Sequence, residues 1–227
     1  MRYTALLIAT FALAACAGGQ GGGPRNFEPK LANPSAVIAA EIAFNRLAQE
    51  KGQWTAFRET AAKDAIMFLP QPTNAHIWLK GKADPAKAVK WQPHKAFMSC
   101  DGKTGVTTGA AQWPGGQSGY FTTVWQYYER GPGNGEWKWV LDHGDFVATP
   151  RESKEMIETK VASCKGKAPA ALLAPPVGAI MKMGFSRDQS LNWTWVVQPD
   201  GARTLNVQLW NGEASDVVLV DRVAAEK

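Results

Sequence analysis

The sequence has few residues of the kinds that build metal centres. It contains only three histidines and three cysteines in 227 residues, and they form neither a CxxC nor an HExxH pattern. A glycine-rich phosphate loop and the G-x-S-x-G turn of serine hydrolases are also missing. We therefore expect no metal and no cofactor.

Apolar runs long enough to span a membrane are missing too. Residues 1–15, MRYTALLIATFALAA, hold an early arginine and then a short apolar stretch. A membrane helix needs about 18 apolar residues or more, so this stretch is too short. It ends in small residues, as secretory signals do, and we interpret residues 1–15 as a signal peptide.

The next residues resemble a lipoprotein anchor. LAAC, at residues 13–16, is similar to the lipobox of bacterial lipoproteins, in which the cysteine becomes the lipidated first residue of the mature chain. Residues 16–33 are rich in glycine, as in a flexible tether, and Ala17 resembles the pattern for export to the outer membrane. The resemblance implies a lipid on Cys16, with the membrane as partner and the outer membrane facing the periplasm as the location in the bacterial cell envelope. Cleavage near Ala15, giving an ordinary secreted protein, is the alternative.

Lipidation of Cys16 would leave two cysteines, Cys100 and Cys164. An even pair in an oxidising compartment favours one disulfide over a metal site. The bridge would close a loop of about 64 residues and contribute on the order of 4 kcal/mol in the loop-entropy model.

Charge of one sign is not concentrated anywhere. The formal net charge is +5 at pH 7, and the densest group of lysines lies at residues 80–95. A nucleic-acid-binding protein would show a basic stripe on a matching fold, so we expect no nucleic-acid partner. The oligomeric state cannot be read from the sequence, and a homodimer stays open.

Residues 34–149 have the pattern of an α+β domain. Apolar residues recur at helical spacing between Pro34 and Ala62, with a break at Gly52, which predicts two helices. A short helix is predicted at residues 84–91. Strand-like segments lie at residues 65–70, 75–81, 95–99, 105–113, 119–129 and 136–146, and the glycine-rich connection before the last one predicts a hairpin.

This order of elements resembles the nuclear transport factor 2-like fold. That cone-shaped α+β family includes ketosteroid isomerases, scytalone dehydratase and the SnoaL-type polyketide cyclases. The resemblance covers residues 35–149 and rests on the element order, on AAKDAIMFLP after the second helix and on the closing strand WKWVLDHG. Within the superfamily the chain is similar to SnoaL-like domains of unassigned function, which implies a pocket on the concave face of the sheet.

The catalytic residues of the isomerases do not carry over. The position of their proton-moving aspartate falls on Leu69, and that of their oxyanion tyrosine falls on Asn45. Leucine cannot accept a proton, so we do not expect isomerase chemistry by that mechanism. Whether the chain is an enzyme stays open.

The strand at residues 136–146 supplies the catalytic candidates. Regular alternation places Trp139, His143 and Asp145 on one face of this strand. Asp142 then lies on the opposite face. A histidine beside a carboxylate can act as a general base, so His143 and Asp145 are candidate catalytic residues. We favour the simpler interpretation, a hydrogen-bonded core histidine that fixes the strand to the first helix.

Three aromatic residues are candidates for binding a ligand. Tyr120, Trp125 and Trp139 would line the pocket of a cone whether or not it is catalytic. Ten tryptophans suit an aromatic cavity, and they suit a filled core equally well.

Residues 150–227 are predicted to add a helix, a linker and a small β-meander packed on the main domain. TPRE is a capping box with Thr149 as the N-cap, and the helix would run to about Cys164. The disulfide would then attach this helix to the cone. Alternation at residues 179–185, 191–198, 204–210 and 216–223 predicts a small antiparallel sheet with one apolar face.

Two classes of function follow from these features. The first is a lipoprotein whose aromatic pocket binds a small apolar or aromatic molecule, with or without catalysis. The second is a structural or protein-interaction component of the cell envelope with a filled cone. An open cavity that reaches Tyr120, Trp139 and His143 would favour the first class, and an interior filled by side chains would favour the second.

Overall fold

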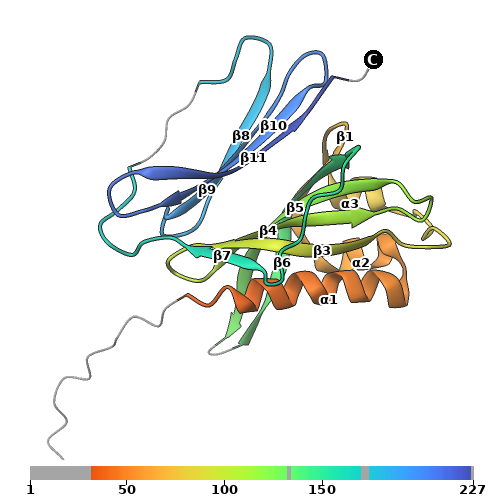
Figure 1. The fold of residues 1–227 in the computed structure, drawn as a ribbon, viewed down its shortest axis with the longest axis horizontal. Coiled ribbons are helices and arrows are strands. Elements are labelled where there is room, and N and C mark those ends of the chain that lie inside the picture. Colours follow the sequence, from red (N-terminus) through yellow and green to blue (C-terminus); the bar gives the residue numbers. More distant parts are fainter. Residues whose placement is uncertain (1–31, 132–133, 170–173, 226–227) are drawn as a thin grey trace, which may run out of the picture. The chain divides into compact units, whose positions relative to one another are not determined.

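The computed structural model describes residues 32–131, 134–169 and 174–225, and it has an α+β fold with two β-sheets and few helices (Figure 1). Both sheets belong to one compact unit, Leu31–Lys227. The predicted signal peptide, Cys16 and nearly all of the predicted tether lie outside the described residues.

The first two helices form where the sequence predicts them. Helix α1 spans Ser35–Lys51 and helix α2 spans Gln53–Thr60. Gly52 separates them with φ +107°, a conformation that glycine adopts without strain. The buried residues of α1 are spaced three and four apart, so they form one stripe that faces the sheet: Val37, Glu41, Phe44 and Ala48.

The main sheet has seven strands in the order β2-β1-β6-β5-β4-β3-β7. Strand β1 runs parallel to β6 and β3 runs parallel to β7, whereas the other neighbours are antiparallel. The strands are β1 Ala61–Leu69, β2 Gln71–Asn74, β3 Lys90–Met98, β4 Thr104–Gln112, β5 Ser118–Gly131, β6 Asn134–Phe146 and β7 Glu158–Val161.

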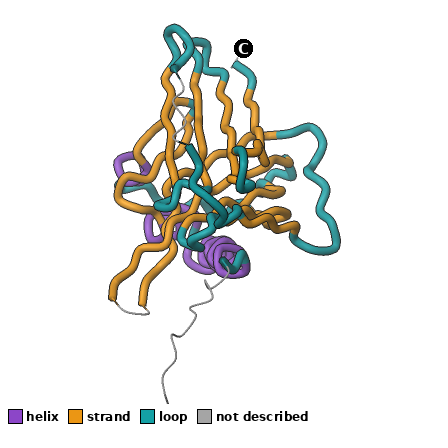
Figure 2. Tube along the Cα trace, turned by 90° about the vertical axis from the view of Figure 1, so that its left-hand side faces the viewer, coloured by secondary structure: helices purple, strands orange, loops and turns teal. Residues whose placement is uncertain are grey.

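A second, antiparallel sheet of four strands follows, as the alternating sequence predicts. Its order is β11-β10-β9-β8. The strands are β8 Ile180–Phe185, β9 Leu191–Val197, β10 Arg203–Trp210 and β11 Ser215–Val223. Alternate residues of β9 and β10 pack against Val124 and Leu141 of the main sheet. Figures 1 and 2 place α1 on the other side of the main sheet, so the main sheet is covered on both faces.

The predicted helix between Thr149 and Cys164 is not formed. Residues 158–161 instead form β7, which pairs in parallel with residues 95–98 of β3. The capping box is a local signal, but the segment also holds β-branched residues and meets a strand edge whose N–H and C=O groups need partners. Pairing along that edge therefore replaces the helix.

The short helix predicted at residues 84–91 is not formed, and a short helix lies before it in the chain. Residues 75–79 form helix α3 (Ala75–Leu79), where the sequence suggests a strand. The side chain of Asn74 caps it by accepting a hydrogen bond from Ile77 N at 3.0 Å. Residues 84–89, which open the predicted short helix, form no helix.

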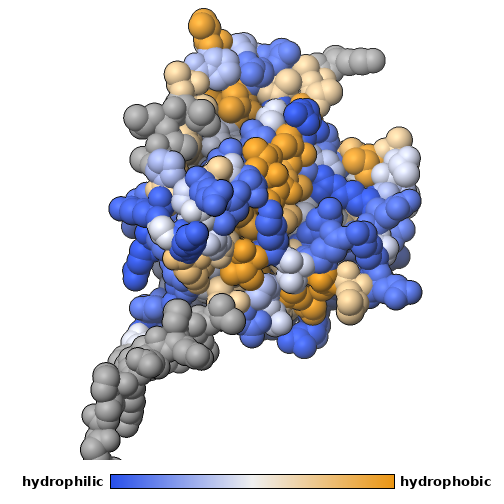
Figure 3. Space-filling view, turned by 60° about the vertical axis from the view of Figure 1, so that its left-hand side comes forward, coloured by the Kyte–Doolittle hydropathy of each residue, from blue (hydrophilic) through white to orange (hydrophobic). Residues whose placement is uncertain are grey.

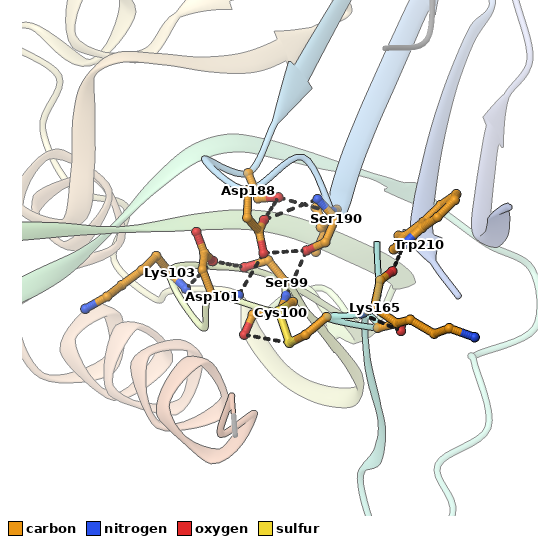
Figure 4. The surroundings of a disulfide bond; sticks show 12 residues. Ser99, Cys100, Asp101, Lys103, Lys165, Asp188, Ser190 and Trp210 are labelled. Atoms are coloured by element: carbon orange, nitrogen blue, oxygen red, sulfur yellow. Dashed lines mark hydrogen bonds between the residues drawn. A yellow bond between two sulfur atoms is a disulfide. The ribbon is translucent and has the colours of Figure 1, made fainter. Parts of the chain in front are cut away.

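Cys100 and Cys164 form the disulfide that the sequence predicts, with their Cα atoms 5.2 Å apart. The bond joins the β3–β4 turn to the segment after β7. The same turn donates from Cys100 N to Ser190 Oγ at 2.8 Å and from Asp101 N to Asp188 Oδ2 at 2.8 Å (Figure 4). The two sheets are therefore linked at this end by hydrogen bonds, and the disulfide holds the β3–β4 turn to the segment after β7.

Within the described residues, none of the helices is long and apolar enough to cross a membrane. On the face seen in Figure 3, apolar residues form a band between polar ones.

Candidate functional site

A cavity of about 760 Å³ opens where strands β1 and β6 separate. Their pairing ends at Met67 and Asp142, but β1 continues to Leu69 and β6 continues to Phe146. Both extensions, which no longer pair with each other, line the cavity. The cavity therefore contacts residues on the helix side of the main sheet and residues on the side of the small sheet.

Aromatic rings form most of the wall on the helix side. Phe57 contacts Trp91 and Trp54 in edge-to-face geometry, with ring centroids 6.2 and 5.6 Å apart. Such a wall favours an apolar or aromatic guest. Seven rings on this side line the cavity: Phe44, Trp54, Phe57, Trp78, Trp91, Trp113 and Phe121.

Glu41 of α1 is a fully buried carboxyl group beneath this wall. It accepts hydrogen bonds from Trp91 Nε1 at 2.6 Å, Thr107 Oγ1 at 2.5 Å and Trp125 Nε1 at 2.8 Å. Burial raises the pKa of Glu41, and these hydrogen bonds oppose the rise. The group accepts from two buried indole donors, of which Trp125 Nε1 also lies 3.2 Å from Thr107 Oγ1.

Asp142 of β6 is a second carboxyl group on the same side of the sheet, and it lines the cavity. Its Oδ2 accepts a hydrogen bond from Thr123 Oγ1 at 3.2 Å, and among the described residues Oδ1 has no partner. Burial, and then the neighbouring Glu41, raise the pKa of Asp142 to about 7. Asp142 is therefore the cavity group that can take up or release a proton near neutral pH.

A β-bulge in β6 explains why Asp142 lies on this face. Trp125 pairs with Trp139 and Val124 pairs with Leu141, so Val140 is an extra residue without a partner in β5. The bulge reverses the alternation beyond it. The prediction that Trp139 and His143 share a face is therefore wrong. Trp139 packs with the helices, whereas Leu141 packs against the small sheet. His143, two residues further along the strand, lies on the same face as Leu141.

His143 lies between the two sheets and is 1% exposed. Its Nε2 accepts a hydrogen bond from Arg203 Nε at 3.3 Å, and its Nδ1 lies 3.8 Å from Asp221 Oδ2. Burial, with the positive charges of Arg203 and Arg151, lowers the pKa of His143 to about 3. The ring is therefore neutral at physiological pH. It links β6 to the small sheet and not to α1.

A network of charges surrounds this histidine. Asp221 accepts hydrogen bonds from Thr122 Oγ1 at 2.6 Å and from the guanidinium of Arg151. Arg151 also lies over the ring of Tyr120, 3.8 Å from its centroid. Burial, with Asp221 nearby, raises the pKa of Tyr120, so the phenol keeps its proton. Its buried hydroxyl has no hydrogen-bond partner among the described residues.

The structure separates the sequence-predicted site residues into two groups. Tyr120, His143 and Asp145 line the cavity, and Asp145 Oδ1 accepts from Phe146 N at 2.8 Å. Trp125 and Trp139 do not line it and are buried in the core on the helix side of the sheet.

Sequence reasoning missed Glu41 and Asp142. A glutamate inside an apolar helical stripe was the available signal for Glu41. No local signal identified Asp142, because its face depends on the bulge at Val140.

No protein-family model, curated protein or solved structure matches the chain. The described residues hold no cluster of histidine, cysteine, aspartate and glutamate that could bind a metal ion.

Proposed function

We propose that this protein binds a small apolar or aromatic molecule in the cavity between β1 and β6. The observation that carries the proposal is the cavity itself, about 760 Å³ in volume and walled by aromatic rings. The alternative role in structure or interaction calls for an interior filled by side chains. The cavity reaches Tyr120 and His143 but not Trp139, and its size supports the binding role.

We further propose that residues 34–149 form a nuclear transport factor 2-like cone. The strand order β2-β1-β6-β5-β4-β3, with β1 parallel to β6, supports this proposal. The two helices packed on one face of the sheet support it as well.

Binding can be tested with a neutral fluorescent probe, N-phenyl-1-naphthylamine. Val89 lines the cavity, so Val89→Trp fills part of it and should weaken probe binding by about tenfold or more. Val177 is fully exposed, and Val177→Trp is the matched control that should leave binding unchanged. Absence of probe binding, or equal binding by the two variants, would reject the proposal.

We also propose that Cys16 carries a lipid that holds the protein at the cell envelope. LAAC and the glycine-rich residues that follow support this location. Cys16→Ser should move the protein from the membrane fraction to the soluble fraction after cell disruption. If the variant sediments with membranes as before, the anchor is not on Cys16.

A further inference from the structure

We infer that the ligand of this cavity is an organic amine, with its ring system among the tryptophans and its protonated nitrogen at Asp142. The inference rests on the proposed binding function and names the class of molecule that the site would select. Asp142 presents Oδ1 without a partner in the described structure, next to an aromatic wall. A carboxylate and aromatic faces are the two groups that bind an ammonium ion in a partly dry site.

The balance of charge on the helix side favours a cation. Glu41 and Asp142 are two carboxyl groups inside the fold, and no lysine or arginine lies among their hydrogen-bond partners in the described chain. Burial raises the pKa of both carboxyl groups, and Glu41 raises that of Asp142 further. An ammonium group would supply the missing positive charge, whereas a carboxylate ligand would add a third acid.

The small-sheet side of the cavity does not attract a cation in the same way. Around Tyr120 lie two guanidinium groups, Arg151 and Arg203, and two carboxylates, Asp221 and Asp145. These four charges balance. A charged ligand therefore gains most at the end of the cavity where Asp142 lies.

An ammonium group already occupies one tryptophan face at the edge of this site. Lys82 Nζ lies 3.9 Å from the centroid of the Trp78 ring, and Trp78 lines the cavity. The rings deeper in the cavity, such as Trp91, have no lysine or arginine over them in the described structure. They therefore line the cavity without a competing cation from the described part of the protein.

The inference predicts a specific pH dependence. The groups packed on Asp142 are Thr123 of β5, Met67 of β1 and, from α1, Glu41. Glu41 is the titratable one. Because Asp142 must be ionised to pair with an ammonium group, affinity for an amine should rise as the pH passes through about 7. A neutral ligand should show no such rise.

The test uses three probes with one ring system: 2-naphthylmethylammonium, 2-naphthylmethanol and 2-naphthoate, titrated by tryptophan fluorescence against the full-length chain. At pH 8 the ammonium probe should bind about tenfold more tightly than the alcohol, and the carboxylate should bind most weakly. At pH 5.5 the preference for the ammonium probe should largely disappear.

Two further measurements assign the effect to Asp142. Asp142→Asn should remove the preference while the alcohol still binds. Asp64→Asn, which removes an exposed carboxylate outside the cavity, should keep the preference. Calorimetry of the wild-type protein at pH 7 in buffers of different ionisation enthalpy should show release of about half a proton per ammonium probe bound. This second measurement does not depend on the folding of a variant.

The possible failures are distinguishable. If none of the three probes binds, the proposed binding function itself fails. If the alcohol binds as tightly as the ammonium probe, or the preference survives in Asp142→Asn, the cavity is a binding site but not one for amines. Binding of the ammonium probe without proton release at pH 7 would also overturn the inference.

Discussion

Asp142 and His143 are neighbours in the sequence, yet their side chains lie on opposite faces of the main sheet. Asp142 lies beside Glu41 and the aromatic wall, with its pKa raised to about 7. His143 lies against Arg203 and Asp221, with its pKa lowered to about 3. His143 Nε2 already accepts a hydrogen bond from Arg203, and its lowered pKa makes the ring a weak base near neutral pH.

His143→Ala should destabilise the fold. The change leaves the buried Arg203 without the acceptor that His143 Nε2 provides, at a cost of about 1–3 kcal/mol. For a chain of this length that is a fall of roughly 2–12 °C in melting temperature. Tyr120→Phe is the matched control, since the hydroxyl it removes has no partner in the described structure, and it should leave the melting temperature unchanged or higher. An unchanged melting temperature for His143→Ala would show that this contact does not contribute to stability.

Asp142 should make the folded state less stable as the pH rises. Its folded pKa of about 7 lies above the ordinary value of 3.8, so the folded protein binds the proton more tightly than the unfolded chain does. Its stabilising contribution is complete below about pH 4 and is lost as the pH rises through 7. His143 acts in the opposite direction, because its pKa is lowered, and it partly masks this slope in the wild type.

The comparison of Asp142→Asn with the wild type removes this masking. Asparagine mimics the neutral acid, so the stability difference in favour of the variant should grow by about 2–4 kcal/mol between pH 4 and pH 8. Chemical denaturation at both pH values measures it, with Asp64→Asn as the control expected to stay flat. A constant difference for Asp142→Asn would mean that Asp142 is ionised freely in the fold.

At the scale of elements, close approaches between strands decide how the aromatic wall is held. Trp91 of β3 reaches Glu41 from a strand that shifts register against β4 between Pro93 and Lys95. Gly109 of β4 lies at this shift. A Cβ atom on Gly109 would overlap the carbonyl oxygen of Gln92, so only glycine permits the two backbones to approach here.

Gly109→Ala should therefore loosen the β3–β4 pairing. The rigid backbone of Gln92 would have to move, and we expect a loss of about 2–3 kcal/mol or more in the free energy of unfolding. Gly115→Ala is the control, because a Cβ atom there meets nothing within 4 Å. Urea denaturation compares the two variants. Equal stability would mean that the β3 backbone can move aside without loss of free energy of unfolding.

At the scale of the whole molecule, the small sheet and the disulfide complete the fold around the main sheet. The small sheet buries the face that carries Val124 and Leu141, and its Arg203 approaches His143. The disulfide closes the end where the β3–β4 turn also bonds to Asp188 and Ser190. Both links tie residues after 150 to the α+β core.

Loss of the disulfide should lower stability strongly. Cys100→Ser opens a loop with a sequence separation of 64 residues. The loop-entropy model gives a cost on the order of 4 kcal/mol, or roughly 8–16 °C in melting temperature. Cys16→Ser, assayed in parallel by thermal melting, should leave the domain's melting temperature unchanged. A change of less than about 1 kcal/mol for Cys100→Ser would show that the hydrogen bonds alone hold this end.

The sequence by itself determined the features that depend on local pattern. The helical stripe of α1, the break at Gly52 and the alternating strands β9 and β10 are each specified by neighbouring residues, because apolar periodicity records which side must be buried. The pairing of Cys100 with Cys164 followed from counting the cysteines once Cys16 was assigned to the lipid anchor.

Tertiary structure decided the features that depend on partners distant in sequence. The segment at residues 158–161 became a strand because the edge of β3 offered unpaired hydrogen-bonding groups. Asp142 reached the cavity because β5 and β6 differ by one residue at Val140, and a single extra residue exchanges the faces of every side chain beyond it. No local pattern around Asp142 records that exchange, since it exists only in the register between two strands.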